Sequence, residues 1–551
     1  MKFQILKKII LLAVISAFVV MADTSCKKFA DVGDGLKIII DYNLIKTSIS
    51  VQLVDATSGN LIGRDGTVSV KTTITGQHKE GVVDISGFQN ENYVYMSQRG
   101  FVSLGLLPEP IYKPSESNPI SFNIVADYEG YVSTSQHVTI AQEGDNFVVI
   151  RMVKLDDPPS GVVVRRENAA TVSDATGRVS SPAVVETPAG KARLTIPEGI
   201  ILKDISGSPL QGNIDVLLVH FDNTDPEAMA SFPGGLVTNV TRSDGSNEDG
   251  MFYSAGFVAI EITDAGGRKA ANFEQGTLGL VSQVNPETFN PVTGNKVVSG
   301  DEIPLWSYDE ANGFWKEESM LMIGNTSGTL EVQAELSHLS YYNFDWFFGG
   351  PFCNIGAPFV FSINPPIVGC FVMYGTMYRQ MDDAFMQTIY MWVCNDTPVD
   401  IYFAPSDVPV YIIWHNEPTS SLSVDPLDNP TFIDNLCGAN PININIINNP
   451  NSTYSTVTIH VEAYCASDTT YIIYPSQGAW IWPVNDPDNM RWVEMIAGDA
   501  QIMDIQIGGT YGIGLYYRDE WYETEFLVTQ SNYSYYDFEI PADVCDEVFG
   551  L

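Results

Sequence analysis

The chain is poor in basic residues. It has 28 Lys and Arg against 67 Asp and Glu among 551 residues, which gives a formal net charge of −39. A surface of this sign repels phosphate backbones, so nucleic acid is excluded as a partner. Adsorption on anionic lipid is excluded for the same reason, and any attachment to a membrane must have another source.

Catalytic motifs are lacking as well. The six histidines are scattered, and the sequence contains no His-Glu-x-x-His run, no Gly-x-Ser-x-Gly elbow and no phosphate-binding glycine loop. We therefore predict a non-enzymatic protein that uses no cofactor. A Ser/His/Asp triad assembled from distant positions, in an extracellular hydrolase, stays open as an alternative.

Helical patterning is absent. No segment keeps an apolar period of 3.6 residues, whereas period-two alternation recurs over stretches such as Ser48–Val54, with glycine-containing turns between them. The chain is therefore predicted to be all-β. One helical turn is expected at Asp225–Met229, where Asp225 is a good N-cap and Pro226 suits the first helical position.

Cysteine is absent between residues 27 and 352, and beyond that gap it occurs six times. An even number of cysteines in an exported chain fits up to three disulfides, whose pairing the sequence leaves open. A zinc site is disfavoured because no pair has Cys-x-x-Cys spacing and no histidine lies nearby. The disulfide candidates are Cys353, Cys370, Cys394, Cys437, Cys465 and Cys545.

The N-terminus carries an export signal. Three lysines precede an apolar run over Ile9–Met21, which is too short to span a bilayer as a helix. The sequence Thr24-Ser25-Cys26-Lys27-Lys28 that follows resembles the lipobox of bacterial lipoproteins, although Asp23 departs from the usual aliphatic residue. The resemblance implies cleavage after residue 25 and fatty acyl groups on Cys26. An ordinary signal peptide, with Cys26 incidental, is the alternative.

Lipidation at Cys26 would fix the location of the protein. Because Lys27 replaces the aspartate that retains many lipoproteins at the inner membrane, we expect a lipid anchor in the outer membrane, with the cell surface favoured. A short polar tether, 26–35, would separate the anchor from the first domain. The membrane, contacted through the lipid, is then the one partner that the sequence predicts.

Three β-sandwich-like domains in tandem are expected after the tether. They cover 36–155, 160–346 and 350–551, and the last is rich in cysteine and aromatic residues. The proline-rich linker Asp156–Gly161 separates the first two.

Two resemblances concern these domains. Motifs across 190–346 resemble a β-sandwich domain of cartilage intermediate layer protein, which is also similar to the sandwich of netrin receptors and ankyrins. Tyr128-Glu129-Gly130-Tyr131 in the first domain is similar to carboxypeptidase-regulatory β-sandwiches. These families imply structural or adhesive work outside the cell. The motifs lie at 194–199, 207–212, 232–236, 254–257, 303–306, 313–318 and 336–345.

The sequence His338-Leu339-Ser340 is similar to the cleavage sites of self-cleaving domains in adhesion receptors. In such sites the serine hydroxyl attacks the preceding carbonyl while the histidine acts as base. Cleavage would then break the Leu339–Ser340 bond. The favoured interpretation is a buried strand in which His338 and Ser340 share one face and hydrogen-bond to neighbours.

Calcium is a weaker hypothesis. Acidic and amide side chains gather around Asp244 and Asp249 and around Asp486 and Asp488. Neither loop fits the EF-hand pattern, and Ca²⁺ needs six to eight oxygen ligands. We interpret both loops as ordinary turns and predict no metal.

Tryptophans cluster in the last domain. Trp480 and Trp482 share a face if 479–483 is a strand, and Trp492 follows closely. If exposed, these rings could stack on sugars; if buried, they form a core, which is the favoured interpretation.

Together these observations predict a non-enzymatic, lipid-anchored outer-membrane protein with a structural, adhesive or ligand-binding role at the cell envelope. A glycan-binding accessory lipoprotein of a polysaccharide uptake system is the main alternative. A protein or glycan ligand is possible, and the sequence leaves its identity and the oligomeric state open.

Overall fold

The computed structural model describes residues 45–84, 87–310, 312–366, 370–415, 422–438, 440–448, 454–465, 472–473, 477–487, 489–496, 499–517, 520–529 and 535–540. The expected signal peptide, Cys26 and the tether lie outside these residues. The described chain is nearly all β-strand, which confirms the predicted fold class. Within it, no helix is long and apolar enough to cross a bilayer.

The first domain is a sandwich of two four-stranded sheets, ordered β3-β5-β1-β8 and β4-β2-β6-β7. The alternation in its sequence produces alternating burial: Ile49, Val51 and Leu53 of β1 face the core. Its strands are β1 (Thr47–Asp55), β2 (Lys71–Thr75), β3 (Val82–Asp84), β4 (Val94–Met96), β5 (Phe101–Leu106), β6 (Ile120–Asp127), β7 (Thr134–Ile140) and β8 (Gly144–Met152), with 3-10 turns at Lys79–Gly81, Glu91–Tyr93 and Pro110–Tyr112.

The second domain packs a five-stranded sheet, β10-β11-β17-β23-β22, against a seven-stranded sheet, β14-β21-β20-β24-β15-β13-β9. Its strands are β9 (Val162–Ser173), β10 (Ala183–Glu186), β11 (Ala192–Ile196), β12 (Ile201–Lys203), β13 (Gly212–Phe221), β14 (Val237–Thr241), β15 (Asn247–Asp264), β16 (Asn272–Glu274), β17 (Leu278–Gln283), β18 (Phe289–Asn290), β19 (Asn295–Lys296), β20 (Glu302–Asp309), β21 (Phe314–Met322), β22 (Gly324–Thr326), β23 (Thr329–Leu336) and β24 (Tyr341–Gly349), with a 3-10 turn at Pro188–Gly190.

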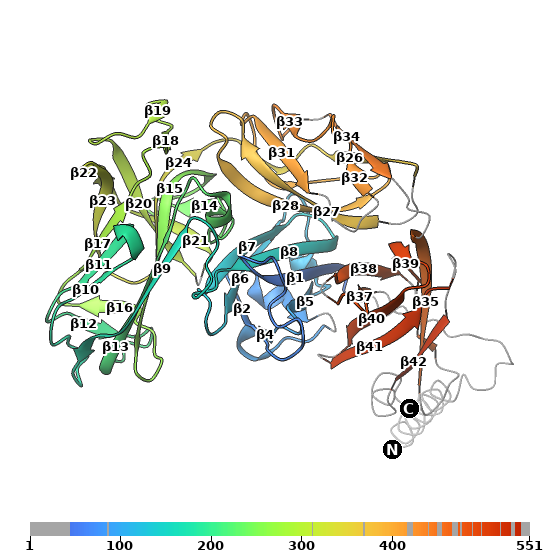
Figure 1. Ribbon diagram of the computed structural model, residues 1–551, viewed down its shortest axis with the longest axis horizontal. Helices are drawn as coiled ribbons and strands as arrows, with labels where there is room; N and C mark the ends of the chain where they lie inside the picture. Colours follow the sequence, from blue (N-terminus) through green and yellow to red (C-terminus); the bar gives the residue numbers. More distant parts are fainter. Residues whose placement is uncertain are drawn as a thin grey trace, which may run out of the picture.

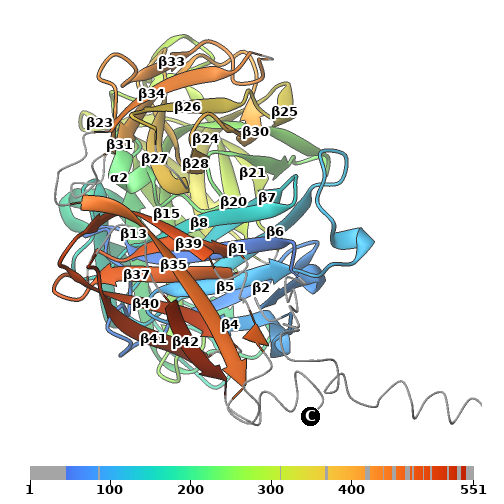
Figure 2. The same cartoon turned by 90° about the vertical axis from the view of Figure 1, so that its right-hand side faces the viewer.

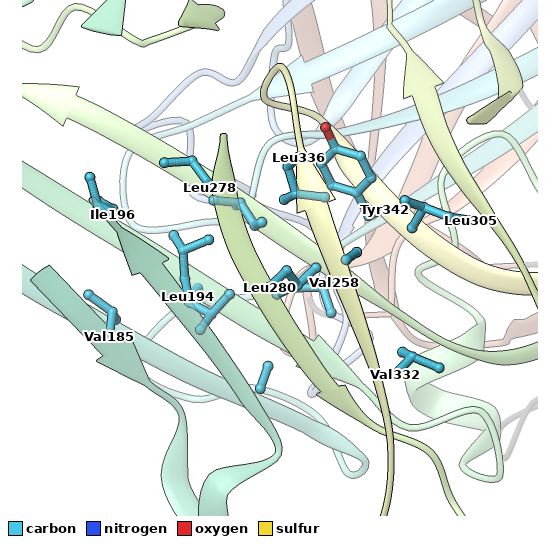
Figure 3. Close-up of a cluster of buried hydrophobic side chains, with 14 of the residues drawn as sticks. Val185, Leu194, Ile196, Val258, Leu278, Leu280, Leu305, Val332, Leu336 and Tyr342 are labelled. Carbon is cyan, nitrogen blue, oxygen red and sulfur yellow. The ribbon is translucent and has the colours of Figure 1, made fainter. Parts of the chain in front are cut away.

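The core of the second domain lies between these two sheets. Figure 3 shows Leu194 and Leu280 of the smaller sheet beside Val258 and Tyr342 of the larger one. The predicted helical turn is confirmed as α2 (Pro226–Met229), whose first turn is capped when Asp225 accepts a hydrogen bond from the Glu227 amide at 3.0 Å.

The region 350–551, expected to be one domain, contains two sets of sheets with separate cores. The third domain has the sheets β29-β26-β34-β32 and β28-β27-β31-β33 and the pair β25–β30. Its strands are β25 (Phe352–Ile355), β26 (Phe359–Asn364), β27 (Cys370–Arg379), β28 (Phe385–Cys394), β29 (Pro398–Val399), β30 (Tyr402–Pro405), β31 (Val410–His415), β32 (Leu422–Val424), β33 (Thr431–Ile433) and β34 (Ile442–Asn448).

The C-terminal domain is one eight-stranded sheet, β36-β35-β39-β38-β37-β40-β41, with β42 paired to β35. Its strands are β35 (Tyr454–Cys465), β36 (Ile472–Ile473), β37 (Gln477–Pro483), β38 (Arg491–Ile496), β39 (Asp499–Gln506), β40 (Thr510–Tyr517), β41 (Glu520–Leu527) and β42 (Tyr535–Ile540).

The first domain lies at the centre of the molecule. In Figure 1 the second domain lies to its left, the third above it and the C-terminal domain to its right. Figure 2 shows the strands of the C-terminal sheet in front of β1, β5 and β2. A buried cluster that includes Phe101 of β5 and Trp480 of β37 confirms the contact between these two domains.

Candidate functional site

Two of the three tryptophans proposed as a sugar platform are buried where domains meet. Trp480 is 2% exposed and its ring lies on Phe101 of the first domain, with ring centroids 3.4 Å apart. Trp482 is 9% exposed and stacks with Trp521. A sugar ring cannot reach these faces, so exposure, the condition for a platform on these two residues, is not met.

We call this cluster the aromatic junction. Its buried members are Phe101, Trp480 and Trp482, and around them pack Leu61, Phe147, Trp392, Met490 and Trp521 from the first, third and C-terminal domains. Gly512 and Gly514 of β40 make room for it, because an added Cβ would lie 2.2 Å from the Trp482 ring and 2.0 Å from the Trp521 ring. Trp492 is the register partner of Trp480 on β38, but its side chain lies outside the described part.

His338 and Ser340, the proposed self-cleavage pair, contact other residues through their side chains. The Ser340 hydroxyl donates to the Tyr308 carbonyl at 2.5 Å and accepts from the Tyr308 amide at 2.9 Å. The His338 Nε2 atom lies 3.8 Å from a Glu318 carboxylate oxygen. Since each side chain is engaged elsewhere, the geometry gives Ser340 no histidine base.

The calcium candidates form local turns. Asp244 is engaged by Ser246, whose amide and hydroxyl donate to it at 2.9 and 2.6 Å. Asp249 accepts from Asn239 across a strand pair at 2.6 Å. Asp486 lies in a turn, and Asp488 is outside the described residues. Among the residues that the structure describes, no three His, Cys, Asp or Glu side chains converge on a metal position.

One predicted disulfide is present in full: Cys353 and Cys437 are joined, with Cα atoms 5.7 Å apart. Cys394 is also disulfide-bonded, and Cys370 is its register partner across β27 and β28. The side chain of Cys465 on β35 and the whole of Cys545 lie outside the described part.

The contact between the first and second domains combines an apolar cluster with hydrogen bonds. The Thr75 hydroxyl and the Asn123 amide nitrogen both donate to the Glu310 carbonyl, at 2.9 and 3.1 Å. The Tyr341 hydroxyl donates to the Ser133 carbonyl. We call this contact, together with His137, the polar junction.

Two ionisable groups lie at the polar junction, Glu310 and the half-buried His137. Burial lowers the pKa of His137 to about 4, and its Nδ1 atom has no partner within the described residues. Burial raises the pKa of Glu310, although the nearby Lys269 opposes that shift. Lys269 lies 2.8 Å from a Glu261 oxygen and 3.7 Å from an Asp127 oxygen, which ties the two domains together.

The second domain also holds a fully buried carboxyl. Asp345 of β24 is fully enclosed, and burial raises its pKa to about 8 despite hydrogen bonds from Ser254 and the Ala255 amide. Its side chain shares a strand face with Asn343, whose amide atoms have no partner among the described residues. Trp306 and Trp315 pack on this same side of the sheet.

A cleft of about 820 Å³ lies between the first domain with its linker and β9 of the second domain. Its volume falls within the range usual for small-ligand sites. Residues on its walls include Asp55, Leu61, Tyr128, Tyr131 and Lys154 of the first domain and its linker, and Arg166 of β9 in the second.

Hydrogen bonds fix one wall of the cleft. The Tyr131 hydroxyl donates to Asp55 at 3.0 Å, and the Ser58 amide and hydroxyl donate to the same carboxylate at 2.8 and 3.0 Å. Burial opposes ionisation of Asp55, but these bonds outweigh it and hold its pKa below the usual value. Asp55 is thereby a structural acceptor, and the Tyr131 ring is held beside that of Tyr128, with centroids 5.7 Å apart.

Only part of this cleft was visible in the sequence. Tyr128–Tyr131 stood out through its family resemblance, whereas Arg166 carries no motif. The cleft arises where two domains meet, and periodicity within one strand does not report such a contact.

Comparisons with known proteins assign no family. No protein-family model matches the chain, and no curated protein is similar to it in sequence. Among solved structures, the full-length RrgB pilus protein of Streptococcus pneumoniae matches with 10% identity and a TM-score of 0.14, over 87% of this chain and 93% of that one. A second structure of RrgB matches with 9% identity and a TM-score of 0.13, over 87% of this chain and 94% of that one. The T6 backbone pilin of Streptococcus pyogenes serotype M6 matches with 8% identity and a TM-score of 0.12, over 87% of this chain and 80% of that one. TM-scores of this size establish no shared fold.

Proposed function

We propose that this protein is a non-enzymatic lipoprotein of the outer membrane, anchored through Cys26, which presents a rigid multidomain β-structure at the cell surface for a structural or adhesive role. The observation that carries the proposal is the set of buried contacts around the first domain. Chains whose domains are joined by flexible linkers alone lack such contacts. A rigid body carries force or a fixed spacing better than a flexible string of domains does.

Three contacts support the rigid arrangement. The second domain meets the first at the polar junction and through a shared apolar cluster that includes Val132, Val153 and Phe221. The third domain meets the first where the rings of Phe147 and Tyr390 lie 6.2 Å apart. The C-terminal domain meets the first at the aromatic junction.

The second and third domains also touch. Met251 of β15 belongs to the core cluster of the third domain. The Arg379 guanidinium lies 3.6 Å from the centroid of the Tyr253 ring and forms a two-pronged ion pair with Asp382 at 2.7 and 2.6 Å. The resemblance of the second domain to the sandwich of cartilage intermediate layer protein agrees with an adhesive role.

The lipid anchor is tested by mass spectrometry of the N-terminal peptide purified from membranes. We expect an acylated Cys26 as the first residue, and release of the Cys26→Ser variant into the soluble fraction. Protease treatment of intact cells then tests surface exposure. An unmodified N-terminus on the wild-type protein would contradict the anchor.

The glycan-binding and hydrolase alternatives have less support. Burial of Trp480 and Trp482 removes the surface on which the glycan-binding alternative was based. For a hydrolase, the cleft supplies carboxylates, but Asp55 is already committed to hydrogen bonds from Ser58 and Tyr131.

A further inference from the structure

The unpaired arginine in the cleft is the starting point. The side chain of Arg166 makes no hydrogen bond and no ion pair within the described part of the chain, and it is exposed. Several other arginines there are paired with carboxylates: Arg151 with Glu227, Arg242 with Glu248, Arg268 with Asp264 and Arg379 with Asp382. Arg193 also lacks a carboxylate partner among the described residues, but of these two arginines Arg166 alone lines the cleft.

The strand directs Arg166 toward the cleft. Side chains alternate along β9, and Val162 and Val164 both pack in the apolar cluster shared with the first domain. Arg166 is two residues beyond Val164, on the same face, and lines the cleft together with it. The Arg166 guanidinium therefore faces the first domain at the edge of the contact between the two domains.

Most other polar groups of the cleft are committed. Asp55 is occupied by Ser58 and Tyr131, and Lys154 lies 3.7 Å from Asp156. The remaining wall is formed by the two tyrosine rings, by apolar side chains such as Leu61 and Leu155, and by the polar side chains of Asn60 and Glu129. The cleft thus offers the Arg166 guanidinium beside a mixed wall of rings, apolar side chains and a carboxylate.

That combination defines a ligand class. The planar fork of a guanidinium matches a carboxylate with two parallel hydrogen bonds. The tyrosine rings and leucines favour a ring that packs against them. The acidic surface around the cleft disfavours a polyanion.

We propose that this cleft binds a small monocarboxylate that carries a ring, with Arg166 holding the carboxylate and the Tyr128–Tyr131 wall packing against the ring. The ring has two possible sources, a sugar acid or an aromatic acid. The proposal goes beyond the structural role given above and does not depend on acylation of Cys26.

The test is titration calorimetry on the soluble Cys26→Ser variant of the full chain. The probes are methyl glucuronoside as the sugar acid and N-acetyltyrosine as the aromatic acid, each beside its uncharged amide. We expect saturable binding of at least one acid at millimolar concentration or below, and at least tenfold weaker binding of the matching amide. The tighter acid identifies the source of the ring.

Matched variants locate the site. Arg166→Met should weaken binding at least tenfold. Arg193→Met should leave it unchanged, because Arg193 is an equally exposed arginine of the same domain that does not line the cleft. Failure of both acids to bind at 10 mM, equal binding of acid and amide, or equal loss in the two variants would overturn the proposal.

Discussion

The two main contacts of the first domain are built in opposite ways. The aromatic junction joins it to the C-terminal domain through stacked rings, with Phe101 and Trp480 almost fully buried. The polar junction joins it to the second domain through hydrogen bonds to Glu310 and Ser133 beside the half-buried His137 ring, and an apolar cluster with Val132, Val153 and Phe221 adds to the same contact. The first contact therefore depends mainly on apolar burial, whereas the second adds polar groups and a histidine whose protonation matters.

This difference predicts different sensitivities. Apolar burial changes little with pH but falls sharply when a large ring is removed. A polar contact that holds a neutral histidine weakens when the histidine takes a proton. The two junctions can thus be disrupted separately, and each disruption has its own signature.

The largest effect is expected from Trp480→Ala. Removing a buried tryptophan leaves a cavity and costs about 3–5 kcal/mol. Hydrogen exchange should then rise in β5 and β37, on both sides of the aromatic junction, while β7 and β20 at the polar junction stay protected. Equal exchange in the variant and the wild type would show that the contact contributes little.

The second-largest effect is expected from acid, which should weaken the polar junction. The pKa of His137 in the folded protein, about 4, lies below its unfolded value of about 6.5. The stabilisation is therefore complete above pH 6.5 and is lost as the pH falls from 6.5 to 4, by about 2–3 kcal/mol.

Denaturant unfolding at pH 7.5 and pH 4.5 measures this loss. His137→Gln should make the pH dependence shallower. His220, whose pKa burial also lowers to about 4, lies inside the second domain, so His220→Gln should change that domain and leave exchange at β7 as in the wild type. An unchanged slope in His137→Gln would refute the assignment.

The pH dependence of stability that Asp345 contributes should have the opposite sign to that of His137. Its folded pKa of about 8 exceeds the unfolded value of about 3.9, so stability falls as the pH rises from 4 to 8. Asp345→Asn should be more stable than the wild type at pH 8 by about 1–2 kcal/mol, since no buried charge can form. Thermal unfolding at pH 5 and pH 8 checks this, and a variant that is less stable at both values would contradict it.

Tyr341→Phe should have a smaller effect. It removes the hydroxyl that donates to the Ser133 carbonyl across the polar junction, which costs about 1 kcal/mol. Tyr411→Phe is the matched control, because that hydroxyl donates to the exposed Asp383 within one domain. Similar losses of unfolding free energy in both variants would show that the interdomain bond has no special weight.

The smallest effect is expected from Arg99→Met. Arg99 lies over the Trp521 ring at 5.6 Å and 3.5 Å from a Glu523 oxygen that is well exposed to solvent. Such contacts contribute less than about 1 kcal/mol and weaken with salt. Denaturation at low and high salt should therefore give nearly equal stabilities for this variant.

Local structure was predictable where local chemistry decides it. The alternation around Ile49 gave β1, and the Asp225–Pro226 pair gave the start of α2. The division of 350–551 into two sets of sheets was not predicted, because composition and turn signals continue across the boundary.

Contacts between domains were beyond the reach of the sequence. A core was favoured over a sugar platform for Trp480, but its partner Phe101 lies in a distant part of the chain and was not foreseen. Trp306 packs on the outer side of the larger sheet, toward the first domain, instead of between the two sheets. Alternation marks a buried face without saying which partner covers it.

The central claim is that the first domain holds its neighbours in one rigid arrangement, and an interdomain distance tests it directly. Spin labels introduced through an unnatural amino acid at Ile205 of the second domain and Asp486 of the C-terminal domain, both exposed, report on both junctions at once. Pulsed electron resonance should give a single narrow distance distribution at pH 7.5, which broadens in Trp480→Ala. A broad distribution in the wild-type protein would contradict the claim.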